Sequence, residues 1–217
     1  MCGFAGFFDL CGNITENKQL NLAVVRRMAK RISLDTFHSH ISDSCAITYT
    51  QINENNNVRF LADNDLLALL ISKDSKDDVN RKGSIQAEQI LKLYSAFGES
   101  FIDHIAGIYS GVIIDGTRKA IVLYRGRLGS APIFYTFIQN RMIFSKEIKG
   151  LFEYPGIQTV LSIAGIAKMF LQDQAKYDGK SVFEDIFSLP LSCTAVFNAD
   201  GFTMKKCSEK MYLGEQQ

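Results

Sequence analysis

Short apolar stretches separated by tight-turn residues constrain the fold of this chain more than any other feature. Ile108–Asp115 and Lys119–Arg125 are two such stretches, and the Gly116-Thr117-Arg118 turn between them is typical of a β-hairpin. Because hairpin strands are antiparallel, the sequence predicts antiparallel sheets and not a parallel α/β fold. Further hairpins are predicted for Val58–Ile71, Pro132–Phe144 and Cys193–Lys206, and single strands for Gly3–Leu10, Cys45–Ile52 and Val182–Phe187.

Helical periodicity interrupts the strands at four places. Lys18–Ile32 repeats apolar residues every three or four positions, with basic residues on the opposite face. Gln86–Phe97 has the same periodicity and ends at Gly98, a typical helix terminator. Shorter helices are predicted at Glu147–Phe152 and Ser162–Gln172. Helices set among antiparallel strands, with no internal repeat or linker, predict a single α+β domain over residues 1–217.

Composition excludes several classes of protein. The 217 residues are 47% hydrophobic and 22% charged, which indicates a globular chain with a core. Twenty-four basic residues against 23 acidic ones leave a net charge of +1, so no electrostatic footprint for nucleic acid or an anionic membrane is expected. The N-terminus lacks a basic leader, and the five cysteines form no CxxC pair, which favours a reducing, cytoplasmic location.

Cys2 is the most informative single position for chemistry. Removal of Met1 would give Cys2 a free α-amine, which titrates at about pH 7.7–8.0 and could accept the thiol proton. An amine-activated nucleophile of this kind is a known catalytic device. The alternative is that Cys2 is an ordinary small buried residue, and retention of Met1 would block the mechanism.

Five blocks of the sequence resemble one family. Met1–Asp9 looks like the opening of class II glutamine amidotransferases, in particular the N-terminal glutaminase domain of asparagine synthetases. The resemblance continues in order at Phe101–Asp115, Arg125–Tyr135, Phe144–Leu151 and Val182–Pro190. It implies the N-terminal-nucleophile hydrolase fold, a four-layer αββα sandwich of two antiparallel sheets between helical layers.

The resemblance also implies an activity and a partner. In the family, the cysteine attacks the glutamine side-chain amide, and the released ammonia reaches a second, ATP-using synthetase domain. The "SGGxDS" loop of that domain is absent from these residues. We therefore expect no cofactor and no metal in this chain, and ATP and Mg only in a partner synthetase or cyclase domain or subunit. A homo-oligomer is also possible, and the chain is either an excised domain or one whose partner is a separate polypeptide.

The chain departs from the family where glutamine should bind. By alignment, the recognition arginine falls at Thr50, the oxyanion-stabilising asparagine and glycine at Leu70 and Ile71, and the amine-binding aspartate at Gln86. Losing one oxyanion donor costs roughly 100- to 1,000-fold in rate. Two hypotheses follow: a degenerate domain that scaffolds an amide-forming partner, or an active glutaminase that supplies ammonia to such a partner.

Three further features have weaker functional interpretations. His38 and His40 have a metal-ligand spacing but no third ligand, so a solvated loop is predicted. His104 is expected to cap or pack against a helix, and Cys207 to be an exposed thiol near lysines. The Cys193–Lys206 hairpin and the Ser162–Gln172 helix are predicted to pack on a partner or on a second copy of the chain.

Overall fold

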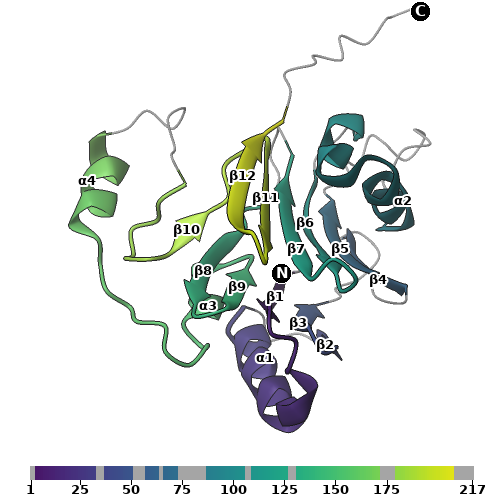
Figure 1. The fold of residues 1–217 in the computed structure, drawn as a ribbon. Coiled ribbons are helices and arrows are strands. Elements are labelled where there is room, and N and C mark those ends of the chain that lie inside the picture. Colours follow the sequence, from purple (N-terminus) through teal and green to yellow (C-terminus); the bar gives the residue numbers. More distant parts are fainter. Residues whose placement is uncertain are drawn as a thin grey trace, which may run out of the picture.

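Two antiparallel sheets lie face to face in the centre of the molecule (Figure 1). The computed structural model describes residues 3–32, 37–50, 57–63, 66–72, 87–105, 109–126, 131–171 and 179–207. Each sheet has six strands, and every registered pair is antiparallel. The predicted α+β sandwich is confirmed.

Strand order places the N-terminal strand inside the first sheet. Sheet 1 runs β10 (Phe187–Ser188), β8 (Phe134–Ile138), β9 (Arg141–Ser145), β1 (Phe4–Asp9), β3 (Cys45–Thr50) and β2 (Phe37–Ile41). Sheet 2 runs β12 (Gly201–Lys206), β11 (Cys193–Asn198), β7 (Ala120–Arg125), β6 (Tyr109–Asp115), β5 (Leu66–Ser72) and β4 (Asn57–Asp63).

The inner faces of the two sheets form the central core. Because side chains alternate along a strand, Phe4 and Phe8 of β1 face inward and meet Leu69 and Val112 of sheet 2. Phe8 also packs edge-on against Phe197 of β11, with ring centroids 6.4 Å apart. This interdigitation joins the sheets.

Helices cover both outer faces, giving four layers. The helix α1 (Lys18–Ile32) and the short α3 (Ile148–Leu151) cover sheet 1, where Val25 and Met28 pack against Phe7. The helix α2 (Ala87–Phe97) and the 3-10 helix η3 (Gly98–His104) cover sheet 2, where Ile90 packs with Leu70. A second 3-10 turn, η1 (Thr15–Asn17), precedes α1.

The helix α4 (Ile163–Leu171) lies apart from these layers (Figure 1). Its N-terminus is tethered by the Ser162 N–H, which donates to the Val182 carbonyl at 2.9 Å, and by a bridge between Leu161 and Phe183. The tether leaves most of the helix away from the sandwich.

Two local predictions were wrong. Val182–Phe187 was expected to be a strand, but only Phe187 lies in β10, because Asp185 has a left-handed φ of 56° that breaks the extended run. His38 and His40 were expected in a loop but lie in β2, which forms by pairing with β3. The remaining strands and helices lie within a few residues of their predicted bounds.

Candidate functional site

The strand after the predicted nucleophile is held in the middle of sheet 1. Cys2 lies outside the described residues, and Gly3 is buried at the start of β1. A methyl group at Gly3 would lie 2.7 Å from Ile32 Cγ2 and 3.5 Å from Lys146 Cδ. The Lys146 N–H donates to the Phe4 carbonyl at 3.0 Å. The chain therefore enters β1 between α1 and the residues that follow β9, at a point where any larger residue would require the Ile32 side chain to shift.

Strand polarity defines which residues share an end of the sandwich with Gly3. Asp9, at the far end of β1, shares a cavity with Leu67 and Ile114 of sheet 2. Asp9 ends β1 and Ile114 lies near the end of β6, so both strands begin at the end of the sandwich opposite the cavity. Gly3, which precedes β1, and Ser110, which lies near the start of β6, are therefore at that same opposite end. We call it the Gly3 end.

The predicted glutamine-binding positions are only partly brought together. Thr50 ends β3 at the Gly3 end, one residue after Tyr49, which pairs with Phe4. Ile71 lies at the same end, paired with Ser110. The side chains of Thr50 and Ile71, and the whole of Gln86, lie outside the described residues.

Leu70 points away from the space between the sheets. Its side chain is fully buried beneath α2, in the cluster that includes Ile90. Its backbone is paired on both sides, with Arg59 of β4 and Gly111 of β6. Residue 70 therefore directs an apolar side chain into the outer core, and its strand is an interior strand of the sheet.

Sequence reasoning missed a polar line at the Gly3 end of sheet 2. Cross-strand register places one residue from each of four neighbouring strands in a line on the inner face. We call this line the inner row: Ser110, Arg125, Cys193 and Lys206. Alternation within the hairpins could have identified it, because Ser110 and Arg125 continue the inward-facing positions of otherwise apolar strands.

The inner row is tied to sheet 1. Arg125 Nη1 donates to the Leu189 carbonyl at 2.7 Å. Burial, together with the nearby Cys193, raises the pKa of Tyr135 to about 12. Burial also raises the pKa of Cys193, while the positive charges of Lys206 and Arg125 oppose that shift. The row therefore runs from the buried Ser110 through the half-buried Arg125 and the buried Cys193 to the exposed Lys206.

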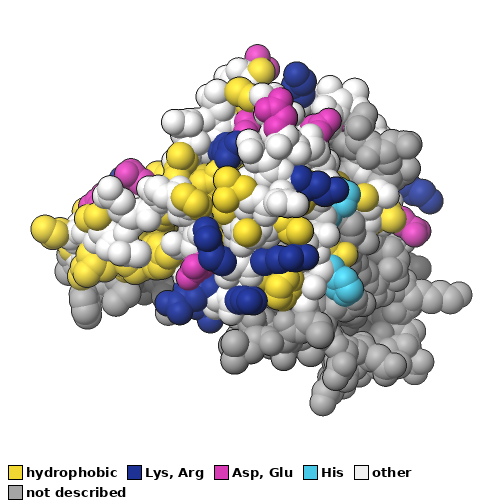
Figure 2. All heavy atoms as spheres, turned by 90° about the horizontal axis from the view of Figure 1, so that it is seen from below, with side chains coloured by type: hydrophobic (Ala, Val, Ile, Leu, Met, Phe, Trp, Pro, Cys, Tyr) yellow, Lys and Arg dark blue, Asp and Glu magenta, His cyan; other side chains and the backbone are white. Residues whose placement is uncertain are grey.

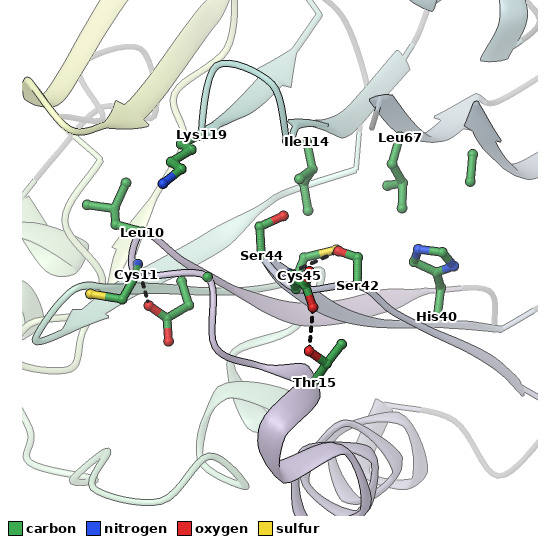
Figure 3. A pocket seen from close by; sticks show the side chains of 15 residues that line it. Leu10, Cys11, Thr15, His40, Ser42, Ser44, Cys45, Leu67, Ile114 and Lys119 are labelled. Carbon is green, nitrogen blue, oxygen red and sulfur yellow. Dashed lines mark hydrogen bonds between the residues drawn. The ribbon is translucent and has the colours of Figure 1, made fainter. Parts of the chain in front are cut away.

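A cavity of about 530 Å³ lies at the other end of the sandwich (Figure 3). Its polar groups are engaged with one another: Asp9 accepts from the Cys11 N–H at 2.8 Å, and Thr15 donates to Asp43. Burial raises the pKa of Cys45 there to about 11, so its thiol is protonated at neutral pH and is not a nucleophile. Because the Gly3 end is remote, this cavity is not the glutaminase pocket of the resemblance.

The histidine pair lies beside a basic surface (Figure 2). His38 and His40 border a surface hollow with Lys18, Arg26 and Lys30 of α1. Within the described part of the chain, no cluster of three or more potential metal ligands occurs. His38 stacks on Tyr49 with ring centroids 5.5 Å apart.

Two smaller predictions concern His104 and Cys207. His104 stacks on Phe97 with ring centroids 3.8 Å apart, which confirms that it packs. Cys207 is half-buried against the outer core of sheet 2 and is not the exposed thiol that was expected.

None of the described helices is long and apolar enough to cross a membrane.

Comparisons with known proteins agree with this architecture. The model of the glutamine amidotransferase domain family matches residues 70–209. Asparagine synthetase (glutamine-hydrolyzing) 2 of Bacillus subtilis (strain 168) is 27% identical over 171 residues, covering 71% of this chain and 23% of that protein. Asparagine synthetase (glutamine-hydrolyzing) 3 of the same organism is 27% identical over 117 residues, covering 54% and 19%.

A solved structure extends the likeness to the fold. The allosteric regulatory enzyme of purine biosynthesis superposes with a TM-score of 0.56 at 10% identity, covering 96% of this chain and 49% of that chain. The chain spans about a quarter of the length of the first asparagine synthetase it matches. It belongs to the glutamine amidotransferase domain family, as a class II domain of the asparagine synthetase type.

Proposed function

We propose that this chain is a degenerate glutaminase domain of an asparagine-synthetase-type system, in which glutamine hydrolysis is weak or lost. In this role it scaffolds an ATP-dependent partner domain or subunit that forms an amide bond. The proposal joins the family membership to the residues that occupy the glutamine-binding positions.

The placement of Leu70 is the observation that carries the proposal. An oxyanion hole needs hydrogen-bond donors aimed at the developing negative charge. At position 70 the side chain is apolar and buried under α2, and the backbone of residues 70 and 71 lies within a strand paired on both sides. These positions therefore offer a poor source of donors for a tetrahedral intermediate.

The surface around α4 supports the scaffold role. The nine residues of α4 include one charged residue, Lys168, although the helix lies apart from the sheets (Figure 1). An almost wholly apolar helix is normally buried. Large apolar side chains are exposed on α4, on the segment before it, and on and near the C-terminal hairpin: Val160, Leu161, Ile163, Leu191, Phe202 and Met204. We assign these two groups of exposed apolar side chains, one at α4 and one at and near the C-terminal hairpin, to the partner contact.

The alternative function is an active glutaminase that supplies ammonia to the same type of partner. The observation in its favour is the retained Cys2, followed by Gly3 and then by β1, an interior strand of sheet 1. In that case Cys2 would act on glutamine held by a pocket different from that of the family.

Glutamate release separates the two functions. We expect purified, Met1-free protein to release glutamate from glutamine at least about 100-fold more slowly than an intact family member, because the oxyanion donors are missing. Cys2→Ala should leave the activity of the parent system largely unchanged. An intact mass measurement establishes first that Met1 has been removed.

A parallel treatment with a glutamine-mimicking electrophile tests whether the Cys2 thiol is reactive even when no glutamate release is detected. Stoichiometric labelling of Cys2, together with glutamine turnover that Cys2→Ala abolishes, would refute the scaffold role. Absence of both labelling and turnover supports it.

A further inference from the structure

The edge of sheet 1 at β2 lacks a second strand partner within the described residues. β2 is the last strand of that sheet and pairs there with β3. Its sequence, FHSHI, contains no lysine, proline or acidic residue. Charged side chains and prolines are common means by which proteins protect an open edge from pairing with another chain. The strand itself therefore carries none of these protecting residues.

The register with β3 shows which backbone groups of β2 point outward. At the turn between the two strands, the Ser42 N–H donates to the Cys45 carbonyl at 2.8 Å. Because hydrogen-bonded and non-hydrogen-bonded pairs alternate along an antiparallel ladder, the two histidines of β2 direct their backbone groups toward β3. Phe37, Ser39 and Ile41 direct theirs away from the sheet. In the described part of the chain, these outward groups have no hydrogen-bond partner.

Three basic side chains of α1 lie beside this edge. Lys18, Arg26 and Lys30 are exposed and line a surface hollow of about 760 Å³ together with all five residues of β2. We call these three residues the cationic row. None of them forms an ion pair with a described residue, and no acidic residue lines the hollow. Figure 2 shows Lys and Arg side chains gathered on this face beside the histidines.

The cationic row and β2 have matching lengths. Lys18 and Lys30 are about 18 Å apart along the helix axis at a rise of about 1.5 Å per residue. Five residues of β2 span about 17 Å at about 3.4 Å per residue. Thr15 donates to Asp43, which holds the start of α1 beside the end of β2. A strand added to β2 would therefore have the row alongside it over its whole length.

The charge of the row determines which kind of strand fits. Arg26 and Lys30 are four residues apart on one helix, so their positive charges repel each other. A second copy of the chain added at β2 would bring its own cationic row beside this one and increase the repulsion. Acidic side chains on the added strand would instead be attracted by all three cations.

We propose that β2 and the cationic row bind an extended acidic segment of a partner polypeptide, which adds to sheet 1 as a further strand. The outward backbone groups of β2 pair with the segment, and the cationic row selects its charge. The site uses none of the exposed apolar residues at α4 and the C-terminal hairpin. It goes beyond the scaffold role and does not depend on the loss of glutamine hydrolysis.

NMR titration of the full chain with an acidic peptide tests the site. The probe is an acetylated and amidated peptide of alternating glutamate and threonine, long enough to span β2. It should bind saturably, and more weakly as the ionic strength rises. At a peptide concentration of about ten times the dissociation constant, amide exchange at Phe37, Ser39 and Ile41 should slow about 10-fold, because their N–H groups gain acceptors.

Ser39→Pro tests strand pairing without changing the charge. Proline removes an N–H that points outward, so the ladder between β2 and β3 keeps its hydrogen bonds. Peptide binding should weaken at least about 5-fold. Ser39→Thr is the control, because threonine keeps both the N–H and a hydroxyl group and should leave binding unchanged.

Arg26→Gln tests the cationic row and should weaken binding about 3-fold while reducing its salt dependence. Arg27→Gln is the matched control, because Arg27 is adjacent, exposed and outside the hollow. It should have a clearly smaller effect on peptide binding. Since both arginines are exposed on α1, this pair of variants decides the question even if Ser39→Pro fails to fold.

Several results would overturn the proposal. They are no saturable binding, binding with unchanged amide exchange in β2, equal weakening in the two arginine variants, and tighter binding of a lysine–threonine peptide or a single-stranded oligonucleotide. A dimer that Ser39→Pro dissociates would also overturn it, because a second copy would then occupy the edge. Light scattering on the peptide-free protein detects such a dimer.

Discussion

Among single residues, Cys45 ties stability to pH. Burial raises the pKa of its thiol from 9.0 to about 11, although Ser42 hydrogen bonds oppose the shift. The raised pKa means that the folded state holds the proton more tightly than the unfolded state. The stabilising contribution of the protonated Cys45 thiol is therefore complete below about pH 9 and is lost as the pH rises through 11.

We expect the free energy of unfolding to fall between pH 9 and pH 11 by up to about 3 kcal/mol from this residue alone. Urea denaturation of wild type and Cys45→Ala across this range measures the contribution. The variant should lose stability less steeply with pH. Cys11→Ala is the control, because Cys11 is exposed and its removal should leave the slope unchanged. Parallel curves for wild type and Cys45→Ala would contradict the prediction.

The ion pair between Asp9 and Arg141 shows how one residue links several elements. Arg141 Nε lies 2.7 Å from the buried Asp9 carboxylate, and Arg141 Nη1 donates to the Tyr154 hydroxyl at 3.0 Å. Asp9 also accepts from the Cys11 N–H. This network fixes the end of β1 against β9 and the segment after α3.

At the level of secondary-structure elements, α4 is positioned by one glycine. Gly165 is buried, and a methyl group there would collide with the Ser181 carbonyl oxygen. In an open helix position, alanine would be favoured over glycine by about 1 kcal/mol. The close contact reverses this preference, because the backbone of residue 181 cannot move without disturbing its bond to Ile186.

Gly165→Ala should therefore destabilise the α4 tether by about 1–3 kcal/mol instead of stabilising the helix. Amide exchange at Ser162, which donates to Val182, measures the tether directly. Ala164→Ser, at an exposed position of the same helix, should leave this exchange rate nearly unchanged. Slower exchange in Gly165→Ala would show that the collision is absent.

For the molecule as a whole, the apolar surface around α4 predicts assembly. Ile163 is 84% exposed and Met204 is 44% exposed. Exposed patches of large apolar residues mark interaction sites more often than chance. Light scattering, alone and with an asparagine-synthetase-type partner, should detect a complex larger than one chain.

The double variant Ile163→Glu/Met204→Glu should lose this complex while keeping its fold, since both side chains are exposed. Leu20→Glu is the control: Leu20 is 65% exposed but lies on α1, far along the chain from the proposed surface. A monomeric wild-type protein at all concentrations that recovers no partner would count against the surface.

Local sequence patterns determined much of the architecture. The helix over Lys18–Ile32 and the hairpin between β6 and β7 could be predicted because 3.6-residue and two-residue periodicities are properties of consecutive residues. The ordered family blocks also predicted the sandwich, which the structure confirms. The same residues did not predict β2, because its strand conformation depends on pairing with β3.

Tertiary structure alone decided which face each residue occupies and what lies opposite it. Leu70 could be aligned with an oxyanion position, but only the packing of α2 placed its side chain in the outer core. Ser110 and Arg125 are 15 positions apart in sequence, and the hairpin register makes them direct neighbours. Lys206 joins the same row only through the pairing of two further strands, β11 and β12. Such long-range register is fixed by burial and hydrogen bonding between strands, which no local pattern contains.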